Sequence, residues 1–459
     1  MPPEISAAFS DRIWEELCAA LERREESAAV LLAGVANTGD RLIFTINRAV
    51  WVPDGHYVER THNRLKIASR GWMPALKAAA AEGLHPVFFH THPGGNASPS
   101  ALDDDVDCAL AQPFRIRAGV DTYASIILGG EPEAPSFSGR AYRGVDAVPI
   151  HHARIVGRQL RLVHNTAHVG AEASTEIHDR QVLAFGQAGQ DILANLKIGV
   201  IGAGGTGSAV IEQLTRLGVR RLVVIDDDFL ASSNVSRVYG SSIGQAREAK
   251  VQIAAHNVER IGLGTELNAI EGRVTRKAPL EKLRDCDVIF GCTDDHAGRI
   301  NLSRLCFQYL IPLIDLGVVI DSDGSNIRSI TGRITYVAPG EPCLVCRGTV
   351  DVGVARDESL DPQERTRLAE EGYARGLEEP DPSVIAYTTL VAASGVADLL
   401  ERQFGFGSPH ISGEMVLRIA DRKVKGRSGS PQDGHFCGNA ATWGLGDQTP
   451  FLGQAVWPE

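Results

Sequence analysis

The sequence lacks three features that would each point to a class of protein: a dense set of cysteines, a long apolar run and a basic stripe. Its eight cysteines are spread over 459 residues. This density of cysteines is too low for a disulfide framework. It favours a reducing compartment and leaves thiols for metal binding or catalysis. No apolar run could cross a bilayer, and the N-terminus lacks the basic start and apolar core of a secretory signal. We therefore expect a cytoplasmic protein that does not enter a membrane.

Charge and length narrow the class further. The formal net charge is −11, which disfavours a general nucleic-acid surface. With 43% hydrophobic and 22% charged residues, the chain has the composition of a globular protein. At 459 residues it exceeds what one compact core usually contains. We expect two domains.

The first third of the chain alternates between helical and strand patterns. The predicted elements are helices over 11–24, 72–82 and 100–111 and strands over 27–34, 41–53, 85–93 and 122–128. The periodicity fades between about 151 and 175. We therefore expect an α/β domain over 1–150, a linker over 151–175 and a second α/β domain over 176–459.

Two histidines close the predicted strand HPVFFHTHP. His90 and His92 alternate on this strand, so their rings project to the same side. Asp103 lies one turn into the helix that follows the glycine loop. Two imidazoles and a carboxylate make an open three-ligand zinc site with a fourth position left for water. The alternative is that the histidines are ordinary polar residues and that Asp103 caps a helix.

This spacing resembles the JAMM motif of MPN-domain peptidases, which reads HxH, seven residues, Ser, two residues and Asp. The resemblance covers about residues 8–145 and implies a cytidine-deaminase-like α/β domain with a catalytic zinc ion. It also implies that Ser100 steadies the tetrahedral intermediate. An upstream glutamate would act as general base, for which Glu26 has the family position and Glu25 is the adjacent alternative. A second alternative is that the fold is kept and its chemistry is lost.

Three more acids follow in the same predicted helix, namely Asp104, Asp105 and Asp107. Acidic residues near a helix N-terminus interact favourably with the helix dipole. We therefore expect these three to form a solvated helix start and not to serve as ligands. Asp103 alone has the spacing of the motif.

The second half opens with a different pattern. The segment NLKIGVIGAGGTGSAVIEQLTRLGVRRLVVIDDD reads as strand, glycine turn, helix and strand, the unit of a mainly parallel, doubly wound sheet. Gly202, Gly204 and Gly207 form GxGxxG, where glycines let a phosphate approach the helix N-terminus. Asp226 ends the next strand, where an acid hydrogen-bonds a ribose hydroxyl. This pattern alone is compatible with binding of NAD, FAD or ATP and does not distinguish between them.

Residues beyond this unit distinguish between these nucleotides. The sequence resembles the ubiquitin-activating family and the ThiF/MoeB-type adenylyltransferases of thiamin and molybdopterin synthesis, which share GxGGxGS, DxD, SNxxR, a lysine and CTD. The matching residues are Gly202, Gly204, Gly205, Gly207, Ser208, Asp226, Asp228, Ser233, Asn234, Arg237, Lys250, Cys292, Thr293 and Asp294. The resemblance spans most of 176–440 and implies a Rossmann-like doubly wound adenylyltransferase domain.

The resemblance implies a role for several of these residues. Asp226 would hold the ribose and Asp294 a magnesium ion, while Asn234, Arg237 and Lys250 would hold the triphosphate of ATP. Adenylyl transfer needs such cations, because charge develops on the α-phosphate and on the leaving pyrophosphate. The alternatives are that Arg237 and Lys250 are surface charges and that Asp226 is a turn residue.

One further residue bears on assembly. Arg180, in HDRQVL before the first strand of this half, matches a family arginine that reaches into the partner subunit's ATP site. The resemblance therefore implies a homodimer. The alternative is an ordinary residue on a helix surface.

The cysteines predict a second metal site. Cys343 and Cys346 form a CxxC knuckle after a predicted strand, and two thiolates need two more ligands to complete a tetrahedron. The family often supplies a second CxxC near the C-terminus, but this chain offers only His435 and Cys437. We expect a structural Cys3His zinc site that holds the C-terminal tail on the sheet. An incomplete or metal-free site is the alternative.

A catalytic thiol is harder to find. Relatives that form a thioester usually carry the cysteine in the crossover segment, but none lies between Arg347 and Phe436. Either the reaction stops at the acyl adenylate, or one of Cys343, Cys346 and Cys437 also acts as a nucleophile. We expect Cys292 to pack beside ATP. The cysteines expected in the core are Cys18, Cys108, Cys286 and Cys306.

By these resemblances, both halves handle the same object, a ubiquitin-like β-grasp protein that ends in glycine. We favour a bifunctional prokaryotic ubiquitin-like pathway enzyme, whose zinc peptidase processes or removes the modifier. Its adenylyltransferase would activate the C-terminal glycine with ATP and Mg²⁺, before a separate conjugating enzyme in some pathways. Two rival hypotheses are an activator of a sulfur carrier in cofactor synthesis and a catalytically silent scaffold that docks ubiquitin-like proteins. A nicotinamide oxidoreductase fits the residues less well.

Overall fold

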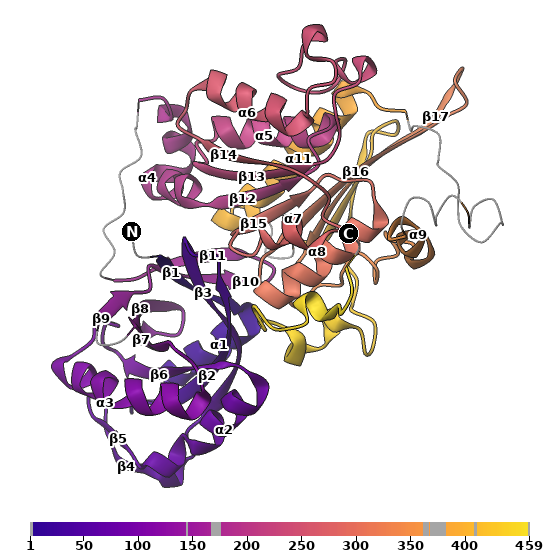
Figure 1. Cartoon of the computed structure of the whole chain (residues 1–459). Helices are drawn as coiled ribbons and strands as arrows, with labels where there is room; N and C mark the ends of the chain where they lie inside the picture. The colour runs from indigo at the N-terminus through magenta and orange to yellow at the C-terminus, as the bar shows by residue number, and fades with distance from the viewer. Residues whose placement is uncertain are drawn as a thin grey trace. The chain divides into compact units, whose positions relative to one another are not determined.

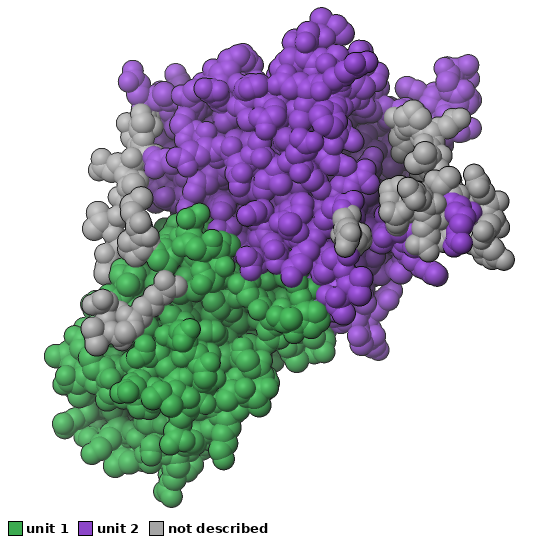
Figure 2. All heavy atoms as spheres, viewed as in Figure 1, with its two compact units in different colours: residues 1–170, 307–310, 439–451 green, residues 171–306, 311–438, 452–459 purple. Residues whose placement is uncertain are grey.

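The computed structural model describes residues 3–143, 146–166, 176–360, 367, 382–407 and 411–457. The chain forms two compact units (Figure 2), and each unit contains its own large sheet. Unit 1 comprises residues 1–170, 307–310 and 439–451. Unit 2 comprises residues 171–306, 311–438 and 452–459. The mixed α/β class predicted for both halves is confirmed.

Unit 1 contains a nine-stranded sheet in the order β11-β10-β1-β3-β2-β6-β7-β8-β9 (Figure 1). Its strands are β1 (Glu4–Ser10), β2 (Ala28–Asn37), β3 (Arg41–Trp51), β6 (His85–Pro93), β7 (Tyr123–Glu131), β8 (Ala134–Arg143), β9 (Asp146–Pro149), β10 (His152–Val156) and β11 (Leu160–His164). A separate two-stranded sheet is formed by β4 (Tyr57–Arg60) and β5 (Leu65–Ile67). Strand β6 lies in the middle of the large sheet, antiparallel to β2 and parallel to β7.

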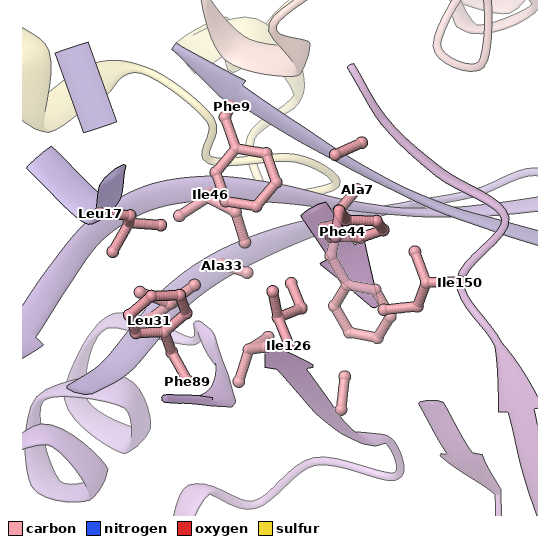
Figure 3. Close-up of a cluster of buried hydrophobic side chains, with 14 of the residues drawn as sticks. Ala7, Phe9, Leu17, Leu31, Ala33, Phe44, Ile46, Phe89, Ile126 and Ile150 are labelled. Carbon is pink, nitrogen blue, oxygen red and sulfur yellow. The ribbon is translucent and has the colours of Figure 1, made fainter. Parts of the chain in front are cut away.

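Helices cover both faces of this sheet. They are α1 (Asp11–Ala19), η1 (Ala20–Glu22), η2 (Asp54–His56), η3 (Ser69–Gly71), α2 (Met73–Glu82) and α3 (Ala101–Ala118). Leu31 and Ala33 of β2 belong to the core that includes α1 (Figure 3), whereas Val30 and Leu32 belong to the core that includes α2 and α3. Because both faces are buried, the central strands are apolar on both sides, and the apolar area removed from water stabilises the layers.

Two distant segments complete unit 1. Residues 439–451 lie along β2 and β3, where Val35 pairs with Gly446 in a parallel bridge and Gly34 N donates to Gly444 O at 3.0 Å. A Cβ atom on Gly34 would lie 2.1 Å from the carbonyl carbon of Leu445, so only glycine allows this approach. Gly446 N in turn donates to Gln308 O at 3.0 Å.

Unit 2 contains an eight-stranded sheet in the order β14-β13-β12-β15-β16-β17-β18-β19 (Figure 1). Its strands are β12 (Lys197–Ile201), β13 (Arg221–Asp226), β14 (Glu266–Glu271), β15 (Val288–Gly291), β16 (Leu313–Ser322), β17 (Ile327–Val337), β18 (Glu414–Arg418) and β19 (Lys423–Arg427). The other helices within the described residues are α4 (Asp179–Asn195), α5 (Gly205–Arg216), η4 (Ser232–Asn234), η5 (Ile243–Gln245), α6 (Lys250–Ile261), α7 (Lys277–Glu281), α8 (His296–Tyr309), α9 (Val352–Glu358), α11 (Ile385–Phe404), η6 (Phe436–Gly438), η7 (Ala440–Thr442) and η8 (Phe451–Gly453).

The strand order of unit 2 reverses between β12 and β15. The chain winds from β12 through β13 to β14 on one side, and then returns to place β15 on the other side of β12. In open parallel sheets, ligands bind at the carboxyl ends of the strands at such a reversal. The predicted doubly wound sheet is therefore confirmed, and its reversal point lies where the glycine turn begins.

The structure corrects the expected domain bounds in two places. Residues 152–164, expected within a linker, form β10 and β11, which join the unit 1 sheet through a parallel pairing of β10 with β1. Residues 439–451, expected in the second domain, belong to unit 1 because their main chain hydrogen-bonds to β2. Strand β1 is a further addition, because its short, buried run EISAAFS has no alternation by which to recognise it.

None of the helices in the described ranges combines the length and apolar character that crossing a bilayer requires.

Candidate functional site

The first candidate site is a cluster at the carboxyl end of β6, which we call the His–His–Asp cluster (His90, His92 and Asp103). His90 Nε2 lies 3.2 Å from His92 Nε2 and 3.1 Å from Asp103 Oδ1, and His92 Nε2 lies 3.6 Å from Asp103 Oδ2. Ligands bonded to zinc at 2.0–2.1 Å in a tetrahedron are about 3.3 Å apart. The three side chains therefore fit one metal ion, as the spacing in the sequence predicts.

Local structure at the start of α3 sets the orientation of Asp103. Ser100 is the N-cap, and its N and Oγ donate to Asp103 Oδ2 at 2.7 and 2.6 Å, while Asp103 N donates back to Ser100 Oγ at 3.3 Å. This is a capping box, which ties the carboxylate to the helix end. Burial opposes ionisation of Asp103, but hydrogen bonds from His90 and Ser100 outweigh it and hold the pKa of Asp103 well below its ordinary value.

The structure separates Glu26 from Glu25. Glu26 is buried and lines a cavity of about 710 Å³ together with the whole His–His–Asp cluster, whereas Glu25 is exposed. Burial raises the pKa of Glu26 from 4.5 to about 7, with a small opposing effect from His90. A carboxyl group with a pKa near neutrality beside a metal site is suited to accept a proton from water. The geometry therefore favours Glu26.

The expectation of a solvated acid run is wrong for Asp107. Asp104 and Asp105 are exposed, but Asp107 is only 2% exposed. Its Oδ1 accepts from Tyr123 Oη at 2.8 Å, and its Oδ2 accepts from Ser125 Oγ at 2.7 Å. Further donors to Oδ2 are Arg140 Nη2 at 2.6 Å and Tyr142 Oη at 3.1 Å. Helical spacing explains the error, since only this position of the three turns toward the sheet.

The second candidate site is the carboxyl edge of β12, β13 and β15, where the glycine turn lies. Gly202 has φ +89° and a Cβ there would lie 2.7 Å from Cys292 O, and a Cβ on Gly207 would lie 1.7 Å from Gly202 O. These two glycines are therefore required by the backbone itself. Gly205 packs against the Arg237 side chain, but a Cβ on Gly204, the N-cap of α5, would meet nothing within 4 Å. The helix N-terminus is thus open to an anionic ligand.

Acidic and basic side chains gather at the end of β13. Asp226 accepts hydrogen bonds from Ala203 N at 2.6 Å and Asp228 N at 2.8 Å, so it orders both the glycine turn and the following loop. Burial raises the pKa of Asp226, and Lys250 partly opposes this shift. The buried Lys250 donates to Asp228 Oδ2 at 2.6 Å. Lys250 is therefore not a surface charge, because it is held at this edge.

The remaining predicted residues lie around the same edge. Asn234 Oδ1 accepts from Ala231 N at 3.1 Å, and Arg237 Nη1 donates to Ser233 O at 3.1 Å, so both are half-buried in the loop that follows β13. Asp294 follows β15 with an exposed side chain, and its main-chain carbonyl accepts from Arg299 Nη1 at 3.3 Å. The pattern in the sequence did not single out Arg299, which also donates to the buried Asp315 at 3.2 Å.

Arg180 is not brought to this edge within the single chain. It lies near the start of α4 with a side chain that is 88% exposed, and its ion pair is with the adjacent Asp179 at 3.9 Å.

The third candidate site is the Cys3His cluster (Cys343, Cys346, His435 and Cys437). His435 Nδ1 lies 3.4, 3.3 and 3.2 Å from the three sulfurs, and Cys346 Sγ lies 3.5 Å from Cys437 Sγ. Zinc bonded to sulfur at 2.3 Å and to nitrogen at 2.0–2.1 Å would separate its tetrahedral ligands by about 3.5–3.8 Å. All four side chains therefore fit one structural zinc ion. Residues 439–451, which directly follow the cluster, belong to unit 1, whereas residues 452–459 belong to unit 2, so the expectation that the whole tail lies on the sheet of unit 2 is corrected for its first part.

Of the four cysteines expected in the core, three are buried and one is exposed. Cys18, Cys286 and Cys306 are buried, and Cys292 is partly buried beside the glycine turn. Burial raises the pKa of the Cys292 thiol far above its ordinary value, which disfavours a nucleophilic thiolate. Cys108 is exposed, contrary to prediction, because its position on α3 faces away from the sheet.

Comparisons with known families divide the chain in the same way. Residues 178–419 match the ThiF family, and residues 7–143 match the family of prokaryotic homologues of the JAB domain.

Curated proteins are similar to about a third of the chain. The chain is 29% identical over 161 residues to the SAMP-activating enzyme E1 of Haloferax volcanii, covering 35% of this chain and 56% of that protein. It is 28% identical over 173 residues to the molybdopterin-synthase adenylyltransferase of Escherichia coli strain K12, covering 37% of this chain and 66% of that protein. The chain thus spans 56% and 66% of the length of these relatives. A crystal structure of E. coli MccB with ATP is 17% identical, with a TM-score of 0.44 over 58% of this chain and 75% of that one.

Proposed function

The chain belongs to the ThiF family, and from this membership we propose that unit 2 is an ATP-dependent adenylyltransferase that activates the C-terminal glycine of a ubiquitin-like protein. We further propose that unit 1, which carries the JAB-like domain, is a zinc peptidase that processes the same protein or releases it from a target. The similar proteins named as a SAMP-activating enzyme and a molybdopterin-synthase adenylyltransferase support this class of reaction.

The adenylyl transfer requires positive charge around the phosphates. A carboxylate oxygen of the terminal glycine attacks the α-phosphorus of ATP, the bond to the bridging oxygen breaks, and pyrophosphate leaves. The open N-terminus of α5 at Gly204 would receive a phosphate, and Lys250 and Arg237 lie on the adjacent segments to neutralise charge. Asp226 would hold the ribose, while Asp294 would hold Mg²⁺, the ion that supplies further charge neutralisation.

In this proposal Lys250 must change its partner. Its ammonium group donates to Asp228 Oδ2 at 2.6 Å in the structure. A triphosphate carries more negative charge than one carboxylate, and would draw Lys250 toward itself. Asp228 would then be released at the mouth of the site, where its side chain is already 62% exposed.

The chemistry of the peptidase would be divided among five side chains and a metal. Zinc bound by His90, His92 and Asp103 would act as a Lewis acid that lowers the pKa of water and polarises a carbonyl group. Glu26 would accept the proton of the attacking water and pass it to the leaving amine. Ser100 would steady the tetrahedral intermediate from the start of α3, where its hydroxyl already hydrogen-bonds to Asp103.

The observation that carries the proposal is where four residues lie around the reversal of the unit 2 sheet: Asp226 ends β13, Arg237 and Lys250 lie in the segments that follow β13, and Asp294 follows β15. The test is exchange of radioactive pyrophosphate into ATP by the full chain, with a small β-grasp protein encoded beside its gene. We expect exchange with the glycine-ended partner and none after the terminal glycine is deleted. Exchange that needs no partner, or none under any condition, would contradict the proposal. The latter result would favour a docking scaffold.

We also propose a homodimer in which Arg180 completes the partner subunit's site. Arg180→Ala and Asp294→Ala should each be inactive alone, because every site then lacks one group. Mixed and re-associated, the two variants should regain part of the exchange activity, since one site per mixed dimer has both groups. Absence of recovery in a mixture shown to exchange subunits would contradict the shared site.

A second candidate function, activation of a sulfur carrier, is favoured by the absence of any cysteine between residues 347 and 436. Without a thiol in the crossover segment, the acyl adenylate would itself be the product handed to a sulfur donor. Mass spectrometry of the partner after reaction distinguishes the two functions, because a terminal thiocarboxylate supports sulfur transfer and an isopeptide conjugate supports protein modification.

A further inference from the structure

We infer that Asp107 is a positioning residue for the His–His–Asp cluster, since it locks α3 to β7 and β8 and thereby holds Asp103 at His90. The inference rests on the proposed function in one respect, which is that the cluster binds zinc. It concerns a buried carboxylate to which neither the motif nor the proposed chemistry gives a part.

The donors to Asp107 are arranged as two cross-strand pairs. Tyr123 lies opposite Tyr142, and Ser125 lies opposite Arg140, in the antiparallel pairing of β7 with β8. All four side chains donate to the carboxylate, at distances between 2.6 and 3.1 Å. Arg140 also donates to Asp104 on the preceding turn of α3. The helix is therefore fixed by directional bonds to two strands at once.

Hydrogen bonds fix the axial position of α3 on the sheet, which apolar packing alone would leave adjustable. The sheet-facing side of α3 also buries apolar side chains such as Leu110 and Phe114, which resist separation from the sheet. Apolar contact is not directional, so it opposes sliding and rotation of a helix only weakly. Hydrogen bonds to a buried carboxylate weaken steeply with angle and distance, so they hold the helix at one axial position.

Asp103 depends on that axial position. Its carboxylate is tied to Ser100 at the start of the same helix, so it moves when α3 moves. Asp107 lies one helical turn further along, so the two carboxylates share a face of α3. Displacement at Asp107 is thus transmitted directly to the ligand atoms of Asp103.

The histidines are tied to the same strands. β7 pairs with β6 in parallel, which places Ser125 beside Phe88 and Ile127 beside His90. The histidine-bearing strand and the network of Asp107 donors therefore share one rigid sheet. A closed loop of contacts runs from His90 through β7 to Asp107 and along α3 to Asp103, where the gap to His90 is 3.1 Å.

The test measures zinc affinity in the full chain by competition with a chromophoric chelator. The class of zinc that His92→Ala removes identifies the His–His–Asp cluster. In Asp107→Asn we expect the affinity of this class to fall about 10- to 100-fold, as is typical when a group that orients a ligand is lost. Asp105→Asn, the same change at an exposed position of α3, should leave the affinity unchanged.

A second, milder variant keeps the test usable if Asp107→Asn does not fold. Ser125→Ala removes one donor and keeps the carboxylate, so we expect a smaller reduction in the same direction. Wild-type zinc affinity in both folded variants, even with a lower melting temperature, would overturn the inference, since Asp107 would then act on stability alone. If the wild-type chain holds no zinc that His92→Ala removes, the proposed peptidase site fails, and this inference fails with it.

Discussion

Arg60 Nε donates a 2.7 Å hydrogen bond to the main-chain carbonyl of Glu26, while its guanidinium reaches the carboxylate of the neighbouring Glu25 only at 3.8 Å. Glu26 N donates to Thr61 O at 2.9 Å. Arg60 and Thr61, at the end of β4, therefore hydrogen-bond to both the carbonyl oxygen and the N–H group of Glu26. Arg60 is itself held over the Tyr57 ring at 4.3 Å. The two main-chain hydrogen bonds at Glu26 fix the backbone here, with the Glu26 side chain lining the cavity and the Glu25 side chain exposed.

Exchange of these two adjacent glutamates for glutamine should give opposite results. Glu26→Gln should lower the rate of peptide cleavage by about 10²- to 10⁴-fold, because it removes the group that accepts the proton. Glu25→Gln should cleave at the wild-type rate. Initial rates on a fluorogenic peptide ending in the modifier's tail measure both, with zinc content as the control. Equal loss in the two variants would mean that neither carboxylate is the base.

The buried Glu26 carboxyl should also make stability depend on pH in metal-free protein. With a folded-state pKa of about 7 and an ordinary value of 4.5, Glu26 holds its proton more tightly in the folded state. Its contribution to stability is therefore present below pH 4.5 and is lost as the pH rises to 7.

Denaturation in chelator should show the effect of this loss. Glu26→Gln should gain about 1 to 2 kcal/mol over wild type on going from pH 4.5 to pH 8, less than the full shift implies because the carboxyl faces a water-accessible cavity. Glu25→Gln should show no such gain. If the free energy of unfolding changes with pH in the same way in all three proteins, the Glu26 carboxyl is not desolvated.

The two proposed activities should be separable by single substitutions. Asp294→Ala should reduce pyrophosphate exchange at least about 100-fold, by analogy with the loss of a charge-stabilising group, and leave cleavage intact. His92→Ala should remove one zinc ion and cleavage, and leave exchange intact. Glu259→Ala, on an exposed face of α6, serves as a neutral control. Loss of both activities in either variant would show that the sites are not independent.

The Cys3His cluster should behave as a structural zinc site. Cys343→Ser should remove one zinc ion per chain, measured by atomic emission, and lower the free energy of unfolding by about 4 kcal/mol or more. Cys108→Ser changes an exposed thiol outside the cluster and should do neither. A full zinc complement in Cys343→Ser would contradict the assignment.

Spacing in the sequence was sufficient to identify the residues that lie together in the His–His–Asp cluster and in the glycine turn. His90, His92 and Asp103 lie within one metal site because alternation on a strand and a capped helix start leave few other arrangements. The glycine turn likewise follows from backbone geometry, as the lack of room at Gly202 and Gly207 shows. Both families were therefore recognisable before any fold was known.

The sequence by itself determined which family each half resembles and which residues its proposed chemistry would use, since local spacing places candidate ligands and glycines within a single strand, turn or helix start. Only the tertiary structure decided which side chains are buried and what they face. Packing buried Glu26 at the cavity and left Glu25 exposed, surrounded Asp107 with four hydrogen-bond donors, and placed residues 439–451 in unit 1. The physical reason is that burial and hydrogen bonding between distant segments depend on packing, and no local pattern records packing.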